Sequence, residues 1–230
     1  MKLEVLPTAE DVARRAAALI AEEARTAASE RGCFLFAASG GATPRRMLTL
    51  LAGEDVPWPL VHLFQVDERV VDAADPARNL AQLRAALVGG ARLAADHLHA
   101  MPVEEADLAA AAASYGATLR RFAGAPPVLD LAHLGLGVDG HTASLVPGDP
   151  ALEVVEFDVA VTARYQGHVR MTLTFPLLER ARRVLWVVTG AEKREILARV
   201  RAGDRSIPAG RVPSRHAHLL ADSAAMGAPR

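Results

Sequence analysis

The chain has 230 residues, of which 51% are hydrophobic, and its 26 basic and 27 acidic residues leave a formal net charge of −1. This length and composition predict one globular domain covering residues 1–230, because a single hydrophobic core can still serve a chain of this size. The balanced charge argues against a nucleic-acid or membrane-surface binder, since clustered Lys and Arg hold such partners. Any anionic ligand must therefore be bound by local groups.

The sequence contains no segment suited to crossing a membrane. The longest stretch without a charged residue, Gly32 to Pro44, has thirteen residues, whereas a bilayer crossing needs about 20 apolar residues. The N-terminus has no apolar signal-peptide core, and a single cysteine, Cys33, cannot form an intramolecular disulfide. We therefore expect a cytoplasmic protein.

Short apolar strands alternate with helices along the chain. An apolar run at 3–6 precedes a helix that opens with a capping box at Thr8 and Asp11 and extends to about Arg31. Strands are then expected at 33–38, 61–66, near 98, and at 129–134, 154–161, 169–175 and 184–188, with helices from about 44, at 76–88, at 104–122, after 176 and at 191–200.

This alternation predicts an α/β fold in which a mostly parallel sheet is covered by helices on both faces. In that architecture ligands bind beyond the carboxyl ends of the strands, so the loops that leave the strands are the candidate functional segments. The segment 202–215, rich in Gly, Pro and Arg, is expected to be a mobile loop.

The first candidate loop, Ser39-Gly40-Gly41-Ala42-Thr43-Pro44, joins a buried strand to a helix. Glycines let backbone N–H groups approach an anion, the start of a helix supplies unpaired donors, and Ser39 and Thr43 add hydroxyl groups. The pattern predicts a phosphate-binding loop without the lysine of a P-loop. An ordinary strand-to-helix turn capped by Thr43 is the alternative interpretation.

The second loop, Asp67-Glu68-Arg69, directly follows the strand that ends at Val66. Three adjacent charges often form only a solvated turn. Their place at the carboxyl end of a strand nevertheless favours a functional role.

The third loop runs from Gly135 to Gly148 and contains Asp139 and His141. It formally matches the dinucleotide-binding fingerprint G-x-G-x-x-G, but Pro147-Gly148 leaves too few residues for the helix of a Rossmann unit, and we reject that interpretation. An acid and a histidine two residues apart suit a general base and the group that orients it.

Two basic residues follow in later strands and helices. Arg170 lies in an otherwise apolar strand, where it needs an anionic partner, either a protein carboxylate or a ligand phosphate. Lys193 lies in the first turn of a helix, where its charge adds to the positive end of the helix dipole and favours an anion. Two His-x-His pairs, at 97–99 and 216–218, have no acid at metal-ligand spacing, so we expect no metal site.

Together these blocks resemble the 6-phosphogluconolactonase family. They follow one another from Ser39 to Lys193, about two thirds of the chain, and the most specific is G-L-G-x-D-G-H-T-A-S-L-x-P-G, between Gly135 and Gly148. The resemblance implies the modified Rossmann-like α/β fold of glucosamine-6-phosphate deaminases and hydrolysis of 6-phospho-D-glucono-1,5-lactone to 6-phosphogluconate in the pentose phosphate pathway. It also implies no metal or organic cofactor and a sugar phosphate as the partner. We further expect a monomer or weak homodimer.

Position by position, the resemblance implies two groups of site residues. In the reaction centre, His141 takes a proton from the water that attacks the lactone C1, and Arg69 or loop N–H groups stabilise the oxyanion. The substrate phosphate is held by Ser39, Gly40, Gly41, Thr43, Arg170 and Lys193, and the reaction centre comprises Asp67, Arg69, Asp139 and His141.

Two other functions remain as alternatives. A deaminase-isomerase of the same superfamily requires an additional carboxylate shortly after the histidine, where this chain has Val146 and no acid before Asp149. A non-catalytic sugar-phosphate sensor would keep the phosphate site but would not need Asp139 and His141. The pattern favours the lactonase over both.

Overall fold

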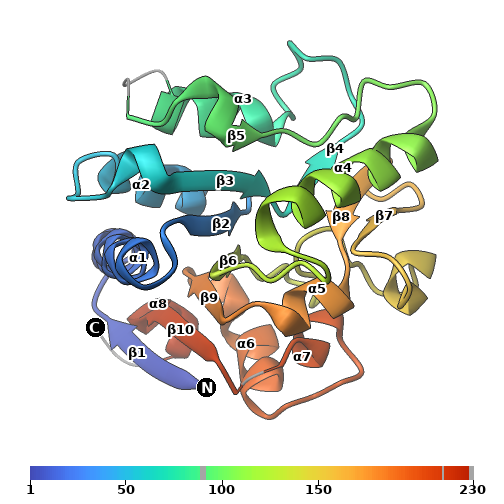
Figure 1. Ribbon diagram of the computed structural model, residues 1–230. Coiled ribbons are helices and arrows are strands. Elements are labelled where there is room, and N and C mark those ends of the chain that lie inside the picture. Colours follow the sequence, from blue (N-terminus) through green and yellow to red (C-terminus); the bar gives the residue numbers. More distant parts are fainter. Residues whose placement is uncertain (89–91, 214, 228–230) are drawn as a thin grey trace.

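The computed structural model describes residues 1–88, 92–213 and 215–227, and within them a parallel sheet of seven strands has the order β1-β10-β9-β6-β2-β3-β5 (Figure 1). Its strands are β1 (Lys2–Leu6), β2 (Phe34–Ala38), β3 (Val61–Gln65), β5 (Leu98–His99), β6 (Leu131–Leu134), β9 (Arg183–Val188) and β10 (Ala217–Asp222). A second, antiparallel sheet has the order β4-β8-β7 and comprises β4 (Asp67–Arg69), β7 (Val159–Val161) and β8 (Arg170–Leu173). The helices are α1 (Ala9–Arg31), α2 (Ala42–Leu51), α3 (Asn79–Leu83), α4 (Leu108–Ala123), α5 (Phe175–Arg180), α6 (Arg194–Arg201), α7 (Pro208–Arg211) and α8 (Ser223–Met226).

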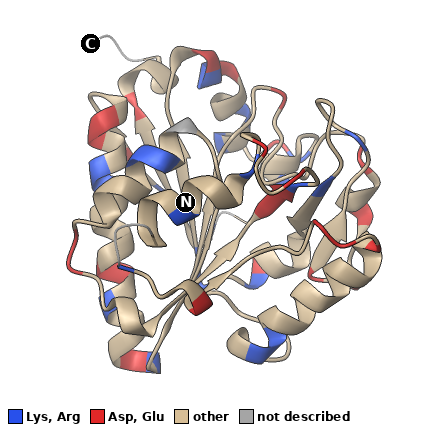
Figure 2. Cartoon of the chain, turned by 90° about the horizontal axis from the view of Figure 1, so that it is seen from above, with Lys and Arg blue, Asp and Glu red and all other residues tan. Residues whose placement is uncertain are grey.

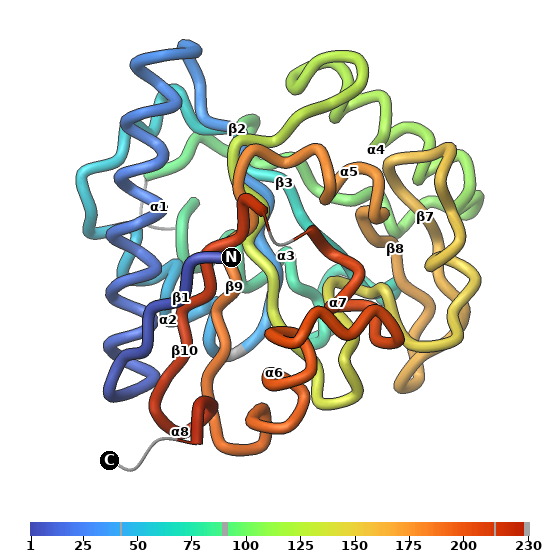
Figure 3. The backbone as a smooth tube through the Cα atoms, turned by 90° about the horizontal axis from the view of Figure 1, so that it is seen from below, coloured from blue at the N-terminus to red at the C-terminus, as the bar shows by residue number. Residues whose placement is uncertain are grey.

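Alternate side chains of the buried strands supply two hydrophobic layers, one on each face of the large sheet. In β2, Phe34 and Phe36 belong to the layer under α1 and α2, whereas Leu35 and Ala37 belong to the layer under α4 and α5. Figure 3 shows α1 and α4 on opposite sides of the strands. Burial on both faces explains why the strands are continuous apolar runs. The expected α/β fold, with helices on both faces of a mostly parallel sheet, is confirmed.

The first helix begins and ends as its sequence predicts. The Thr8 side chain accepts a hydrogen bond from the Asp11 N–H at 3.2 Å, and Gly32 ends α1 in the left-handed conformation, with φ of 79°. None of the described helices combines the length and apolarity needed to span a bilayer. Figure 2 shows basic and acidic residues interspersed over the helices, as the balanced charge predicts.

Two helices are shorter than expected at their start. The helix expected at 76–88 begins at Asn79 as α3 and continues through 84–88 as a π-helical turn. The helix expected from 104 begins at Leu108, because the Asp107 side chain caps it by accepting the N–H groups of Ala109 and Ala110 at 3.0 Å.

The second half of the chain corrects three expectations. The strand expected at 154–161 is reduced to β7, and Val155 and Phe157 are exposed. The segment expected as a loop at 202–215 contains α7, anchored by the Ala209 N–H, which donates to the Gly140 carbonyl at 2.9 Å. Strand β10, which was not expected, lies between β1 and β9.

The charged triplet Asp67-Glu68-Arg69 is not a solvated turn. It forms β4, which pairs with β8 so that Arg69 stands opposite Arg170. Asp67 and Glu68 are buried. The small sheet thereby carries charged groups to the carboxyl edge of the large sheet, where β3 ends.

Candidate active site

A pocket of about 210 Å³ lies at the carboxyl ends of β2, β3, β6 and β9. Its lining consists of Ser39, Gly40, Asp67, Arg69, Asn79, Gly135, Leu136, Gly137, His141, Ala143, Arg170 and Lys193. A larger groove of about 440 Å³ between α4 and β7 is mostly apolar and contains none of the predicted site residues. The smaller pocket is therefore the candidate site, because it gathers residues from all the predicted loops.

His141 and Asp139 form a pair at the edge of this pocket. The His141 Nδ1 lies 2.6 Å from the Asp139 Oδ1, which also accepts the backbone N–H of His141 at 3.2 Å. With Nδ1 engaged, Nε2 is the ring nitrogen available to a ligand. Burial acts to raise the pKa of Asp139, but the adjacent His141 and hydrogen bonds from Tyr165 and His141 outweigh it and lower that pKa. Asp139 is thus a carboxylate that orients the imidazole.

Asp67 lines the pocket but is almost completely buried. Its Oδ2 accepts a hydrogen bond from the Ser144 hydroxyl at 2.5 Å, and its backbone carbonyl accepts the Asn79 amide at 3.0 Å. Burial raises the pKa of Asp67, although the Ser144 hydrogen bond and the nearby arginines oppose the shift. Asp67 therefore releases its proton less readily than an exposed aspartate.

Arg69 and Arg170 are both directed to the pocket from opposite positions of β4 and β8. Burial, and then the charge of Arg69, lower the pKa of Arg170. Among the described residues Arg170 has no hydrogen bond to a carboxylate, and the Nε atoms of both arginines are buried without a protein partner. Two guanidinium groups that repel each other and face a common cavity are suited to a dianionic ligand.

Lys193 reaches the pocket from the turn that follows β9. It ends the 3₁₀ turn η5 (Ala191–Lys193), which starts after Gly190. The Gly190 N–H donates to both carboxylate oxygens of Asp222, at 3.1 and 3.2 Å, so the end of β10 fixes this turn.

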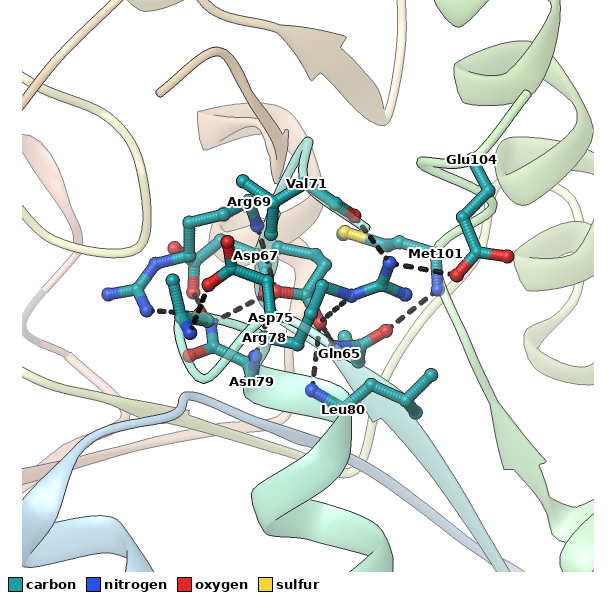
Figure 4. A network of polar contacts seen from close by, with 12 residues as sticks. Gln65, Asp67, Arg69, Val71, Asp75, Arg78, Asn79, Leu80, Met101 and Glu104 are labelled. Atoms are coloured by element: carbon teal, nitrogen blue, oxygen red, sulfur yellow. Dashed lines mark hydrogen bonds and ion pairs between the residues drawn. The ribbon is translucent and has the colours of Figure 1, made fainter. Parts of the chain in front are cut away.

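A buried carboxylate, Glu68, holds the Arg69 and Asn79 backbones in place. Figure 4 shows the side chains of Gln65, Arg69 and Asn79 grouped in this network. Its Oε1 accepts the N–H groups of Arg69 at 2.8 Å and of Asn79 at 2.9 Å. Its Oε2 accepts the Leu80 N–H and the Gln65 side-chain amide, both at 2.8 Å. The network joins β3, β4 and the start of α3 into one unit next to the pocket.

The loop predicted to bind phosphate, residues 39–44, enters the pocket only in part. Ser39 and Gly40 line it, and the Ser39 N–H and hydroxyl donate to Nδ1 and the carbonyl of His133 at 3.3 and 3.0 Å. The Gly41 N–H donates to the Gln82 side chain at 3.1 Å, and the Thr43 hydroxyl lies 3.0 Å from the Thr189 hydroxyl, so neither residue lines the pocket.

Other residues at the site could not be recognised from the sequence. Ser144, although within the Gly135 to Gly148 block, carried no signal of its bond to Asp67, and nothing in the sequence marked Tyr165 or Asp222. Each reaches its partner from a distant segment: 77 residues separate Ser144 from Asp67, and 26 separate Tyr165 from Asp139. Only the folded chain brings these groups together.

The family profile described as glucosamine-6-phosphate isomerases/6-phosphogluconolactonase matches residues 7–221. The chain belongs to this family, which confirms the resemblance seen in its motifs. Among its curated relatives, the 6-phosphogluconolactonase of Nostoc sp. is 37% identical over 202 residues, covering 86% of this chain and 84% of that protein. The 6-phosphogluconolactonase of Mycobacterium tuberculosis is 33% identical over 207 residues, covering 85% and 84%.

Solved structures place the fold in the same group. The 6-phosphogluconolactonase of Trypanosoma brucei has a TM-score of 0.87 and 25% identity, with 98% of this chain and 97% of that chain covered. A monomeric glucosamine-6-phosphate deaminase, with a TM-score of 0.76, 18% identity and full coverage of both chains, shares the fold.

Proposed function

We propose that this protein hydrolyses 6-phospho-D-glucono-1,5-lactone to 6-phosphogluconate. The observation that carries the proposal is one pocket in which the His141–Asp139 pair lies together with Arg170 and Lys193. The lactonases among the relatives support the same substrate. Arg170, Lys193 and the Gly40 N–H would hold the phosphate, because the Ser39 N–H already donates to His133, and the lactone carbonyl would lie beside His141.

In this mechanism His141 acts first as a base and then as an acid. Its Nε2 takes a proton from water as the water oxygen bonds to the lactone C1, while Asp139 stabilises the imidazolium at Nδ1. The carbonyl oxygen becomes an oxyanion that Arg69 stabilises. When the bond from C1 to the ring oxygen breaks, the imidazolium returns the proton to that oxygen, and the product is a carboxylic acid that ionises in water.

Substrate choice tests the phosphate site. In a coupled assay with spontaneous hydrolysis subtracted, we expect strong preference for the phosphorylated lactone over glucono-1,5-lactone, and no release of ammonia from glucosamine-6-phosphate. Arg170→Ala or Lys193→Ala should raise KM by about 10- to 100-fold, the size of a lost charge-assisted hydrogen bond. Arg182→Ala, an exposed arginine at the amino end of β9, is the matched control and should leave KM unchanged. Equal turnover of both lactones would refute the site.

The base is tested separately. His141→Ala should lower kcat by about 100- to 10,000-fold, the usual contribution of a general base. A variant that keeps near-normal turnover would overturn the assignment of His141, even if the phosphate preference holds.

A further inference from the structure

The hairpin between β7 and β8 brings an aromatic residue to the reaction centre. Tyr165 and His168 close the turn by exchanging backbone hydrogen bonds of 2.9 and 3.1 Å. The two residues between them, Gln166 and Gly167, have φ of 48° and 85°. Two successive positive φ values define the tight turn that suits the twist of a β-hairpin. The tip of the hairpin is therefore a defined structure, and it fixes the direction of the Tyr165 side chain.

The hydroxyl of Tyr165 makes two hydrogen bonds and also lies 3.5 Å from the His141 Nδ1. It donates to the Asp139 Oδ2 at 2.8 Å and accepts from the Gln166 amide at 3.0 Å. Burial, and then the hydrogen bond to Asp139, raise the pKa of Tyr165, so the phenol remains a neutral donor at physiological pH. The two oxygens of Asp139 are thus divided between two partners, Oδ1 holding His141 and Oδ2 holding Tyr165.

The ring of Tyr165 contacts the same site from its edge and its face. It lies edge-on to the His141 ring, with 5.5 Å between the centroids. The Arg170 guanidinium lies 5.1 Å from the centre of the ring, within the range of a cation–π contact. One side chain therefore touches the orienting acid, the proposed base and a proposed phosphate ligand.

We infer that Tyr165 is a positioning residue that locks the Asp139 carboxylate, so that His141 keeps its proton on Nδ1 and presents Nε2 to the water. The inference rests on the proposed role of His141 and extends it. About a third of the Asp139 side chain is exposed, so without Tyr165 its carboxylate would be free to turn towards solvent. The ring would then lose its fixed tautomer, and the reacting geometry would be populated for less of the time.

The test removes the hydroxyl and keeps the ring. Tyr165→Phe should lower kcat by about 10-fold, the value of one hydrogen bond to a charged group, while KM for the phosphorylated lactone stays constant because the Arg170 contact with the ring remains. In ¹⁵N-histidine NMR spectra the wild type should show His141 with a slowly exchanging proton on Nδ1, and the variant should lose that signal. Tyr115→Phe, which deletes the hydroxyl of the other tyrosine from a buried bond to Gln65, is the control: it should lower Tm without changing kcat or the His141 signal.

The outcomes separate this inference from the proposed function. Wild-type kcat in Tyr165→Phe, or a lower kcat with the Nδ1–H signal unchanged, would refute the positioning role. A rise in KM without a fall in kcat would also refute it. None of these results would affect the base itself, whose failure is shown by an active His141→Ala.

Discussion

At the scale of single residues, glycines make room for functional side chains of the protein itself. A Cβ atom at Gly137 would lie 2.1 Å from the His141 Nδ1, and one at Gly40 would lie 2.0 Å from the Asn79 Oδ1. From the sequence, Gly40 is expected to let a phosphate approach the backbone. The structure adds a second reason, because the same absence of a side chain lets Asn79 pack against the loop.

Gly137→Ala should therefore damage the reaction centre and spare the fold. Gly137 does not have a positive φ, so the backbone accepts alanine, but the new methyl group must displace the His141 ring from Asp139. We expect kcat to fall at least about 100-fold, since general-base catalysis requires the ring to be in place, with Tm nearly unchanged. Gly116→Ala in α4, where a Cβ meets nothing closer than 3.5 Å, is the matched control and should keep full activity. A Gly137→Ala enzyme with wild-type kcat would show that catalysis does not require the observed contact between His141 and Asp139.

The candidate residues that the sequence could reveal are those that share a short loop. Asp139 and His141 are two positions apart, so their contact follows from local chain geometry. Tyr165 and Asp222 reach the site through the β7–β8 hairpin and through β10, neither of which was fully predicted. Their contributions depend on tertiary contacts, which one sequence does not encode in a readable pattern.

At the scale of elements, β4 and α3 are joined by the Glu68 carboxylate more than by apolar packing. Glu68→Gln should be strongly destabilising, because the new NH₂ group faces backbone N–H groups that need an acceptor. Leaving buried donors unsatisfied next to Arg78 should cost about 3 to 5 kcal/mol in urea unfolding.

The control for this prediction is Glu104→Gln. Glu104 also pairs with Arg78, at 2.9 Å, but 59% of its side chain is exposed. Arg78 is buried, but the Glu104 end of the pair is solvated and the amide oxygen of a glutamine can still accept from Arg78, so the control should lose only about 0 to 1 kcal/mol. Similar losses in both variants would mean that Glu68 acts only through its charge on Arg78.

The elements that were predicted correctly are those with a strong local signal. Strands β2, β3, β6 and β9 are mostly apolar on both faces because helices cover both faces, and the pattern is visible in the sequence. Strand β10 is equally buried but contains His218 and Asp222, which have specific partners in Glu4 and in the Gly190 N–H. His62 and Gln65 in β3 and His133 in β6 are equally polar, so it is the pairing of β10 with β1 and β9, rather than its composition, that identifies it as a strand.

At the scale of the whole molecule, a buried histidine should make the free energy of unfolding depend on pH. His133 in β6 is fully buried, and its Nδ1 accepts the Ser39 N–H at 3.3 Å. Burial lowers the pKa of His133 to about 4, whereas the same side chain in the unfolded chain titrates near about 6.5. At a pH between these two pKa values, His133 binds a proton in the unfolded chain but not in the folded protein. The free energy of unfolding should therefore fall as the pH drops from about 6.5 to about 4, and this contribution is complete above about 6.5.

The predicted size of the effect is about 3 kcal/mol, from roughly 2.5 pH units at 1.36 kcal/mol each. Asp67 acts in the opposite direction, because its raised pKa lets the folded protein take up a proton first. The measurement is therefore a difference: urea unfolding of the wild type and of His133→Asn, whose Oδ1 replaces the Nδ1 acceptor without titrating, at several pH values from 4 to 8. The free energy of unfolding should change more steeply with pH in the wild type below about pH 6.5, because only the wild type gains a proton at residue 133 when it unfolds. Parallel curves would show that His133 is protonated in the folded sheet and that Ser39 has another acceptor.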